Sequence, residues 1–98
     1  MKISDVHFTL AVEDDVICLV DIGSGVSITN GAEVVITELS LWFGDDLASK
    51  RVIYRDTMGN WDGLAQRGGR FFRYIALGGV TDRTLAIEAA RADPNWPS

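Results

Sequence analysis

Cysteine, histidine and proline are scarce in this sequence of 98 residues, which contains one cysteine, one histidine and two prolines. A single cysteine, Cys18, excludes an internal disulfide, and its place in the apolar run VICLV favours a buried structural thiol. Zinc sites need several cysteine or histidine ligands. Because His7 and Cys18 are the two such residues, we expect no bound metal and no cofactor.

Long hydrophobic segments are also missing. No run approaches the roughly 18 apolar residues that a membrane-spanning helix needs. The start, MKISDVHF, lacks the apolar core of a signal peptide. We therefore expect a cytoplasmic protein without membrane contact. The length suffices for one globular domain, residues 1–98, and is too short for two hydrophobic cores.

Basic residues are almost absent from the first half. Residues 1–49 carry a net charge of −8 and residues 50–98 a net charge of +3, so the whole chain carries −5. The negative total disfavours binding to nucleic acids or anionic membranes. Two explanations of the asymmetry stay open. Either the halves neutralise each other within the domain, or they form a polarised surface that meets a partner or a second copy of the chain.

Hydrophobic patterning predicts five β-strands. Apolar residues alternate with others over residues 6–12, which is typical of a half-buried strand. The nearly continuous apolar segment 16–22 indicates an interior strand that pairs with the first. Gly68 and Gly69 indicate a hairpin turn. The remaining strands are expected at residues 51–56, 61–65 and 70–77.

Two helices are expected, one of them with an alternative. Over residues 31–43 apolar residues fall at helical spacing, Asn30 and Glu33 imitate a capping box, and Gly44 suits the C-terminal cap. The β-branched residues 34–37 favour a strand instead, so both possibilities remain open there.

The second helix is expected to be capped by Thr81 and to end at Asp93-Pro94. The predicted order is β-β-α-β-β-β-α. This order indicates an α+β fold in which both helices pack on a mostly antiparallel sheet.

The stretch YRDTMGNWDGL is the most distinctive in the sequence, and turn chemistry explains it. Asp56 is expected to accept hydrogen bonds from backbone amides downstream, and Gly59 or Asn60 to supply the left-handed residue. Tyr54 and Trp61 flank the turn and are expected to be aromatic partners across the hairpin.

The stretches RVIYRDTMGNWDGL and ITNGAEVVITEL resemble a pattern in small bacterial proteins without an assigned activity, some of which are cargo of mobile elements. The resemblance covers about half of the chain. It implies an accessory protein and gives no residue a role.

Signals of catalysis are few. A calcium loop fails on spacing, because Met58 stands where an oxygen ligand is required. An enzyme would depend on Asp56 or Asp62, together with Arg55 or Tyr54, near the turn. This small enzyme with a carboxylate site is one alternative function.

Two further hypotheses concern nucleic acid. RGGRFFRY mixes basic and aromatic residues as single-strand binders do, but the element order and the acidic total make nucleic-acid binding an unfavoured function. Its residues Phe72 and Tyr74 are expected to line the core with Arg73 outside, or the reverse. An acidic inhibitor that mimics nucleic acid is a further alternative, and it requires the carboxylates of residues 13–15, 45 and 46 to line one face.

Aromatic residues favour an interaction protein. Trp42 lies at the end of the first predicted helix and Trp96 lies in the tail, so one small core is not expected to hold both. We expect a non-enzymatic binding protein that acts as a homo-oligomer, most simply a homodimer. A protein or small-molecule partner would occupy an apolar cleft. The candidate binding residues are Trp42, Tyr54, Arg55, Trp61, Arg73 and Trp96.

Trp96 carries a separate prediction. Chain ends are usually disordered unless side chains hold them. A tryptophan in a free tail would expose a large apolar side chain, so we expect Trp96 to pack against the domain or across a subunit boundary.

Overall fold

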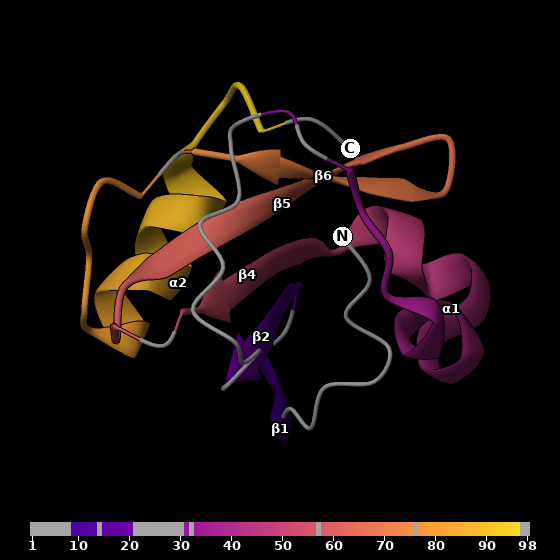
Figure 1. Cartoon of the computed structure of the whole chain (residues 1–98), viewed down its shortest axis with the longest axis horizontal. Coiled ribbons are helices and arrows are strands. Elements are labelled where there is room, and N and C mark those ends of the chain that lie inside the picture. Colours follow the sequence, from indigo (N-terminus) through magenta and orange to yellow (C-terminus); the bar gives the residue numbers. More distant parts are fainter. Residues whose placement is uncertain are drawn as a thin grey trace.

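The computed structural model describes residues 9–13, 15–20, 31, 33–56, 58–75 and 77–96. They form a six-stranded sheet, in the order β1-β2-β4-β5-β6-β3, with helices on both faces (Figure 1). The strands are β1 (Thr9–Glu13), β2 (Val16–Val20), β3 (Glu33–Val34), β4 (Arg51–Arg55), β5 (Trp61–Arg67) and β6 (Arg70–Tyr74). The helices are α1 (Thr37–Phe43), the 3₁₀ helix η1 (Gly44–Ser49) and α2 (Arg83–Ala92).

The predicted α+β class and the mostly antiparallel sheet are confirmed. β2 and β4 pair in parallel, and the other neighbouring strands pair antiparallel. A parallel pair needs a long crossover. Here the chain between β2 and β4 includes β3 at the far edge of the sheet and then α1 and η1. Residues 6–8 and 21–22 of the predicted strands lie outside the described residues.

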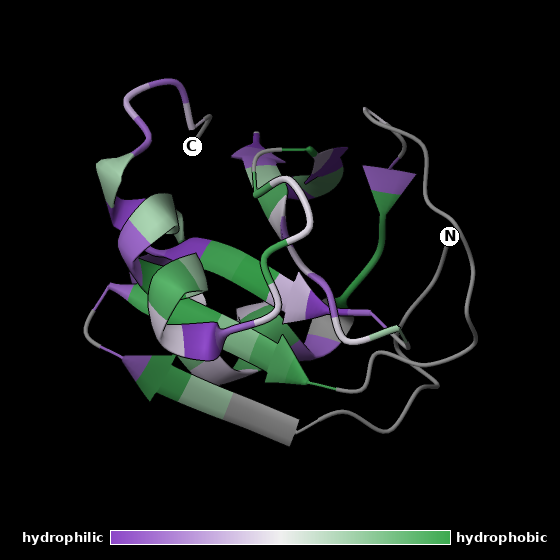
Figure 2. Cartoon of the chain, turned by 90° about the vertical axis from the view of Figure 1, so that its left-hand side faces the viewer, coloured by the Kyte–Doolittle hydropathy of each residue, from purple (hydrophilic) through white to green (hydrophobic). Residues whose placement is uncertain are grey.

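Two hydrophobic clusters occupy opposite faces of the sheet. Successive side chains of a strand point to opposite faces of the sheet. Ile17 and Val52 therefore belong to the cluster under α1, and Cys18 and Ile53 belong to the cluster under α2. Figure 2 shows the hydrophobic residues along the central strands. Because β2 is covered on both faces, its sequence is apolar at every position.

The prediction of one helix over residues 31–43 is wrong in its first half. Glu33 and Val34 form the short edge strand β3, paired with Phe72 and Phe71 of β6, and this is the sixth strand. α1 begins at Thr37, and Ile36 in extended conformation precedes it. The β-branched residues favour the extended backbone, and pairing with β6 satisfies its hydrogen-bonding groups.

The end of α1 and both predicted turns agree with the sequence. Gly44 has φ +53° and donates its backbone N–H to the carbonyl of Ser40. Gly68 and Gly69 both have positive φ in the turn between β5 and β6. Asp56 Oδ1 accepts hydrogen bonds from the backbone amides of Met58 and Asn60, both at 2.9 Å, and Gly59 is the left-handed residue.

Two local predictions are corrected. Tyr54 and Trp61 are not cross-strand partners, because Tyr54 faces Asp62 in the register and Trp61 faces Arg55. The two aromatic residues therefore belong to clusters on opposite faces. In α2 the capping side chain is Asp82 rather than Thr81, and it accepts a hydrogen bond from the Leu85 amide.

None of the described helices is long and apolar enough to cross a membrane.

Candidate functional site

The predicted binding residues lie in separate parts of the molecule. Trp61 and Trp96 belong to the hydrophobic cluster under α2. Tyr54 and Arg73 lie together on the other face, with the guanidinium carbon 5.5 Å from the centre of the tyrosine ring. Trp42 lies on α1 and is 55% exposed. The structure therefore forms two pairs and one exposed aromatic residue rather than a single cleft.

Arg55, the sixth predicted residue, is the last residue of β4. It is half-buried and pairs in register with Trp61. Since Tyr54 points to the opposite face, Arg55 and Tyr54 do not share one site.

Trp96 packs against the body of the same chain, as the sequence predicted. It is 6% exposed, and its ring meets Tyr74 edge-on at a centroid distance of 5.1 Å. The ring also lies over Gly63 so closely that a Cβ there would be 2.3 Å from Cη2. Gly63 is therefore the residue that admits the indole. A glycine inside a predicted strand was the available signal of such a close approach.

Hydrogen bonds hold the chain that leads to Trp96. Arg51 donates from Nη1 to the carbonyl oxygens of Ala90 and Asp93, where α2 ends. The Asp93 carboxylate accepts from the Tyr74 hydroxyl at 2.9 Å and from the Asn95 amide at 2.8 Å. Burial, with the hydrogen bond to Asp93, raises the pKa of Tyr74. The Arg51 guanidinium thus satisfies backbone carbonyl groups at the end of α2, and the role of these contacts is structural.

Tyr54, Asp62 and Arg73 form a polar cluster on the face that carries α1. Arg73 donates from Nη2 to Asp62 Oδ2, and both side chains are largely buried. Burial raises the pKa of Tyr54 to about 12. Within the described chain, Nε and Nη1 of Arg73 are buried without a hydrogen-bond partner. Because these atoms are shielded from solvent, the cluster is not an open binding site.

The two carboxylates that an enzyme would need make structural contacts. Asp56 holds the turn, and Asp62 accepts hydrogen bonds from Arg73 and from the Gly63 amide. Neither lines the two pockets described below. The described residues include no cluster of three or more potential metal ligands. His7 lies outside the described residues.

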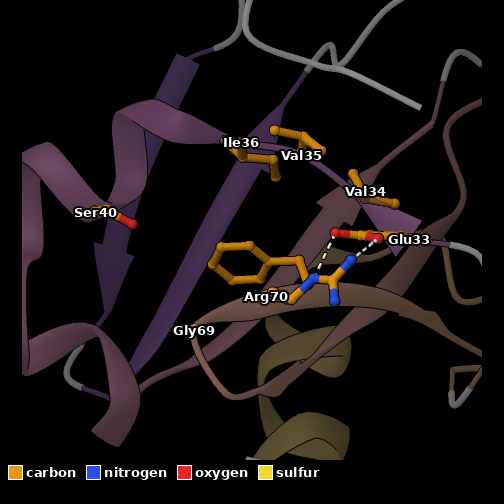
Figure 3. Close-up of a pocket in the computed structure, with 8 residues that line it drawn as sticks. Glu33, Val34, Val35, Ile36, Ser40, Gly69 and Arg70 are labelled. Carbon is orange, nitrogen blue, oxygen red and sulfur yellow. Dashed lines mark hydrogen bonds and ion pairs between the residues drawn. The ribbon is translucent and has the colours of Figure 1, made fainter.

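Two adjacent pockets flank α1. The edge pocket, about 130 Å³, lies between α1 and the β3–β6 edge and is lined by residues including Glu33, Val35, Ser40, Gly69 and Arg70. In Figure 3 the guanidinium of Arg70 faces the carboxylate of Glu33. The two groups form a bidentate ion pair, with Nε–Oε1 at 2.8 Å and Nη2–Oε2 at 2.5 Å. Arg70 lowers the pKa of Glu33 through this contact.

The η1 pocket, about 260 Å³, lies between η1 and the β5–β6 turn and shares Ser40 and Gly69 with the edge pocket. Its other lining residues include Asp45, Leu47 and Gln66. The Gln66 side chain donates to the carbonyls of Leu47 and Lys50, both at 2.8 Å, and so joins η1 to β5. No expectation for this pocket followed from the sequence, because Gln66 lies just beyond the strand predicted at residues 61–65.

Exposed apolar side chains gather on α1. Leu41 is 81% exposed and its neighbour Trp42 is 55% exposed. Asp45 and Asp46 follow in the first turn of η1, both exposed. The other exposed large apolar residues of the described chain are separated from one another in sequence. Single exposed apolar residues are ordinary, whereas an exposed leucine and tryptophan at consecutive positions are unusual.

Ion pairs link the acidic and basic halves. Arg70 pairs with Glu33, Arg83 with Glu13, and Arg91 with Asp15. The first of the two explanations of the charge asymmetry therefore accounts for these residues. Arg91 lowers the pKa of Asp15 through a hydrogen bond.

The described acidic residues do not line one face. Glu13 and Asp15 contact arginines of α2, whereas Asp45 and Asp46 lie in η1, and α1 with η1 covers the other face of the sheet (Figure 1). The acidic-mimic hypothesis lacks the arrangement that it requires among these residues.

Comparison of the chain with protein-family models, with curated proteins and with solved structures found no match.

Proposed function

We propose that this chain is a non-enzymatic interaction protein that binds a protein partner through Leu41 and Trp42. The observation that carries the proposal is the exposure of these two large side chains at consecutive positions of α1. Trp61 and Trp96, by contrast, are 2% and 6% exposed. Tryptophan is among the residues that contribute most to binding at protein interfaces. We call Leu41, Trp42, Asp45 and Asp46 the α1 patch.

The partner has apolar side chains accompanied by basic ones. Asp45 and Asp46 follow the apolar pair closely in sequence and form no ion pair with other described residues. Opposite charges across an interface steer association and fix the orientation of the partner. Lysine or arginine beside an apolar contact therefore matches the α1 patch.

The homodimer expected from the sequence remains a prediction. In a two-fold contact the same surface of each copy meets itself. If the α1 patch were that surface, the carboxylates of the two copies would face one another, and such like-charge contacts are unfavourable. A different protein is therefore the occupant that we propose for this patch.

A small-molecule function has less support. Sites for drug-sized ligands and cofactors enclose roughly 300–1,000 Å³. The edge and η1 pockets are smaller, at about 130 and 260 Å³. Their size suits a single side chain of a partner.

The test compares two variants in an affinity capture from a lysate of the source cells. Leu41→Ser with Trp42→Ser removes the apolar contact, and Met58→Ser removes a methionine that is 84% exposed elsewhere. We expect partner proteins that are recovered with wild type and Met58→Ser but lost with the double variant. Equal recovery with all three proteins would refute the proposal.

Sedimentation of the purified chain completes the test. We expect wild type and the double variant to sediment alike across the micromolar range, because a homodimer, where it forms, uses a surface other than the α1 patch. A dimer of the wild type that the double variant abolishes would show that the α1 patch binds a second copy instead.

A further inference from the structure

We infer that the η1 pocket receives a lysine or arginine side chain of the protein partner, with Asp45 as its counter-ion. The inference rests on the proposed function, because it assumes a partner that binds beside α1. It adds a residue-level recognition element, since it assigns one chemical class of side chain to one pocket.

The first argument is position. Ser40 lines the η1 pocket, and Leu41 is the next residue of α1. Consecutive helical residues are about 100° apart around the axis, so Leu41 projects from a neighbouring side of α1 and not from the side opposite Ser40. A partner chain that packs on Leu41 can therefore place a neighbouring side chain in the pocket.

The second argument is the chemistry of the lining. Leu47 and Ala48 supply apolar surface, and Asp45 supplies a carboxylate that forms no ion pair with other described residues. Lysine and arginine combine an aliphatic stem with a charged end, and they pack the stem on apolar surface while the charge remains near water. The η1 pocket combines apolar surface, which matches the aliphatic stem, with a carboxylate, which matches the charged end.

The third argument comes from the edge pocket next to it. Arg70 lines that pocket, but its guanidinium already forms a bidentate pair with Glu33. The edge pocket therefore presents a neutralised pair, while the η1 pocket presents an acid. A cationic side chain is therefore attracted to the η1 pocket more than to the edge pocket, although Ser40 and Gly69 line both.

The fourth argument is the fixed shape of the pocket. The two hydrogen bonds from Gln66 to the carbonyls of Leu47 and Lys50 tie η1 to β5. Gln66 itself is 7% exposed, so these bonds are shielded from water. A wall held in this way is ready for a side chain without a large rearrangement, which lowers the entropic penalty of binding.

The test is an NMR titration of the full chain with N-acetyl-arginine amide, and with N-acetyl-citrulline amide as the uncharged probe of similar shape. We expect the arginine probe to shift the backbone amide signals of Ser40, Gly44, Gly68 and Gly69. The citrulline probe should bind about two- to fivefold more weakly, the ratio that an exposed ion pair supports. High salt should remove most of the difference.

Two variants separate a specific contact from the general negative charge. Asp45→Asn and Glu88→Gln change the net charge equally, but Glu88 is exposed on α2, outside the α1 patch, and does not line the pocket. We expect Asp45→Asn to raise the Kd of the arginine probe about two- to fivefold and Glu88→Gln to leave it nearly unchanged. Equal effects of the two variants, equal binding of both probes, or shifts confined to other residues would overturn the inference.

The outcomes also separate this inference from the proposed function. If partner capture depends on Leu41 and Trp42 but the arginine probe does not bind, the interaction function stands and the pocket assignment fails. If the arginine probe binds as expected but the double variant captures the same proteins as wild type, the pocket assignment stands and the proposed function fails.

Discussion

Tryptophan has opposite surroundings on the two sides of the sheet. On the α2 side, Trp96 fills the space that Gly63 leaves, and hydrogen bonds to Asp93 hold the chain that carries it. On the α1 side, Trp42 stays 55% exposed next to Leu41. The same residue type is thus buried where a facing glycine makes room for it, and stays largely exposed where it does not face the core. The predictions below test this division.

The largest expected effect is the loss of the Trp96 side chain. Trp96→Ala removes a buried indole, and such truncations cost about 3–5 kcal/mol of unfolding free energy. Urea denaturation measures the loss, and deletion of residues 95–98 should act in the same direction. Because Trp96 packs within its own chain, the loss should not depend on protein concentration. A change below about 1 kcal/mol would contradict the assignment of the tail to the core.

High pH should lower the unfolding free energy through Tyr54, which is buried in the cluster under α1. The folded pKa of Tyr54 is raised to about 12 by burial, whereas an unfolded tyrosine has a pKa of about 10. The unfolded state therefore loses this proton first as pH rises. The stability that depends on a neutral Tyr54 is complete below pH 10 and is lost towards pH 12, up to about 2–3 kcal/mol.

The variant Tyr54→Phe isolates the part of this stability loss that comes from the Tyr54 hydroxyl. Urea denaturation of the variant and of wild type between pH 8 and pH 12 should give a steeper decline for wild type. Parallel declines would show that Tyr54 does not contribute to the alkaline loss.

Gly63→Ala should destabilise the protein by about 1–3 kcal/mol, the usual effect of overpacking a core. The new methyl group collides with the Trp96 ring and displaces it. In a Trp96→Ala background the same substitution should have little effect, because the collision is gone. Additive losses in the double variant would show that the two residues act separately.

The smallest expected effect is that of Trp42→Ala on stability. A side chain that is 55% exposed contributes little to the folded state, so the unfolding free energy should change by no more than about 0.5 kcal/mol. Thermal denaturation of the variant beside Trp96→Ala gives the direct comparison. A loss as large as that of Trp96→Ala would place Trp42 in the core and remove the main support for the α1 patch.

Several parts of the fold were predictable because their signals are local. The apolar run of β2, the turn held by Asp56 and the glycine turn between β5 and β6 each depend on residues that are close in sequence. The burial of Trp96 was also predictable, since a free tail gains nothing from exposing an indole. The local evidence conflicted over residues 31–43, and there the helix prediction was half wrong.

The candidate site was less predictable. The sequence singled out aromatic and arginine residues, but the folded chain distributes them over two faces and the outside of α1. The η1 pocket combines the consecutive helices α1 and η1 with the β5–β6 turn, which follows η1 by about 20 residues along the chain. No spacing within the sequence indicates such a combination.

By itself the sequence determined the class of fold, most of the strands and the turns, because hydrophobic periodicity and glycine conformations act over a few neighbouring residues. Tertiary structure decided whether Glu33 and Val34 form a strand, since the free β6 edge supplied the partner. It also decided where the Trp96 ring packs. That choice depended on Gly63, 33 positions from Trp96, having no side chain where the indole lies, and such steric complementarity exists only once the chain has folded.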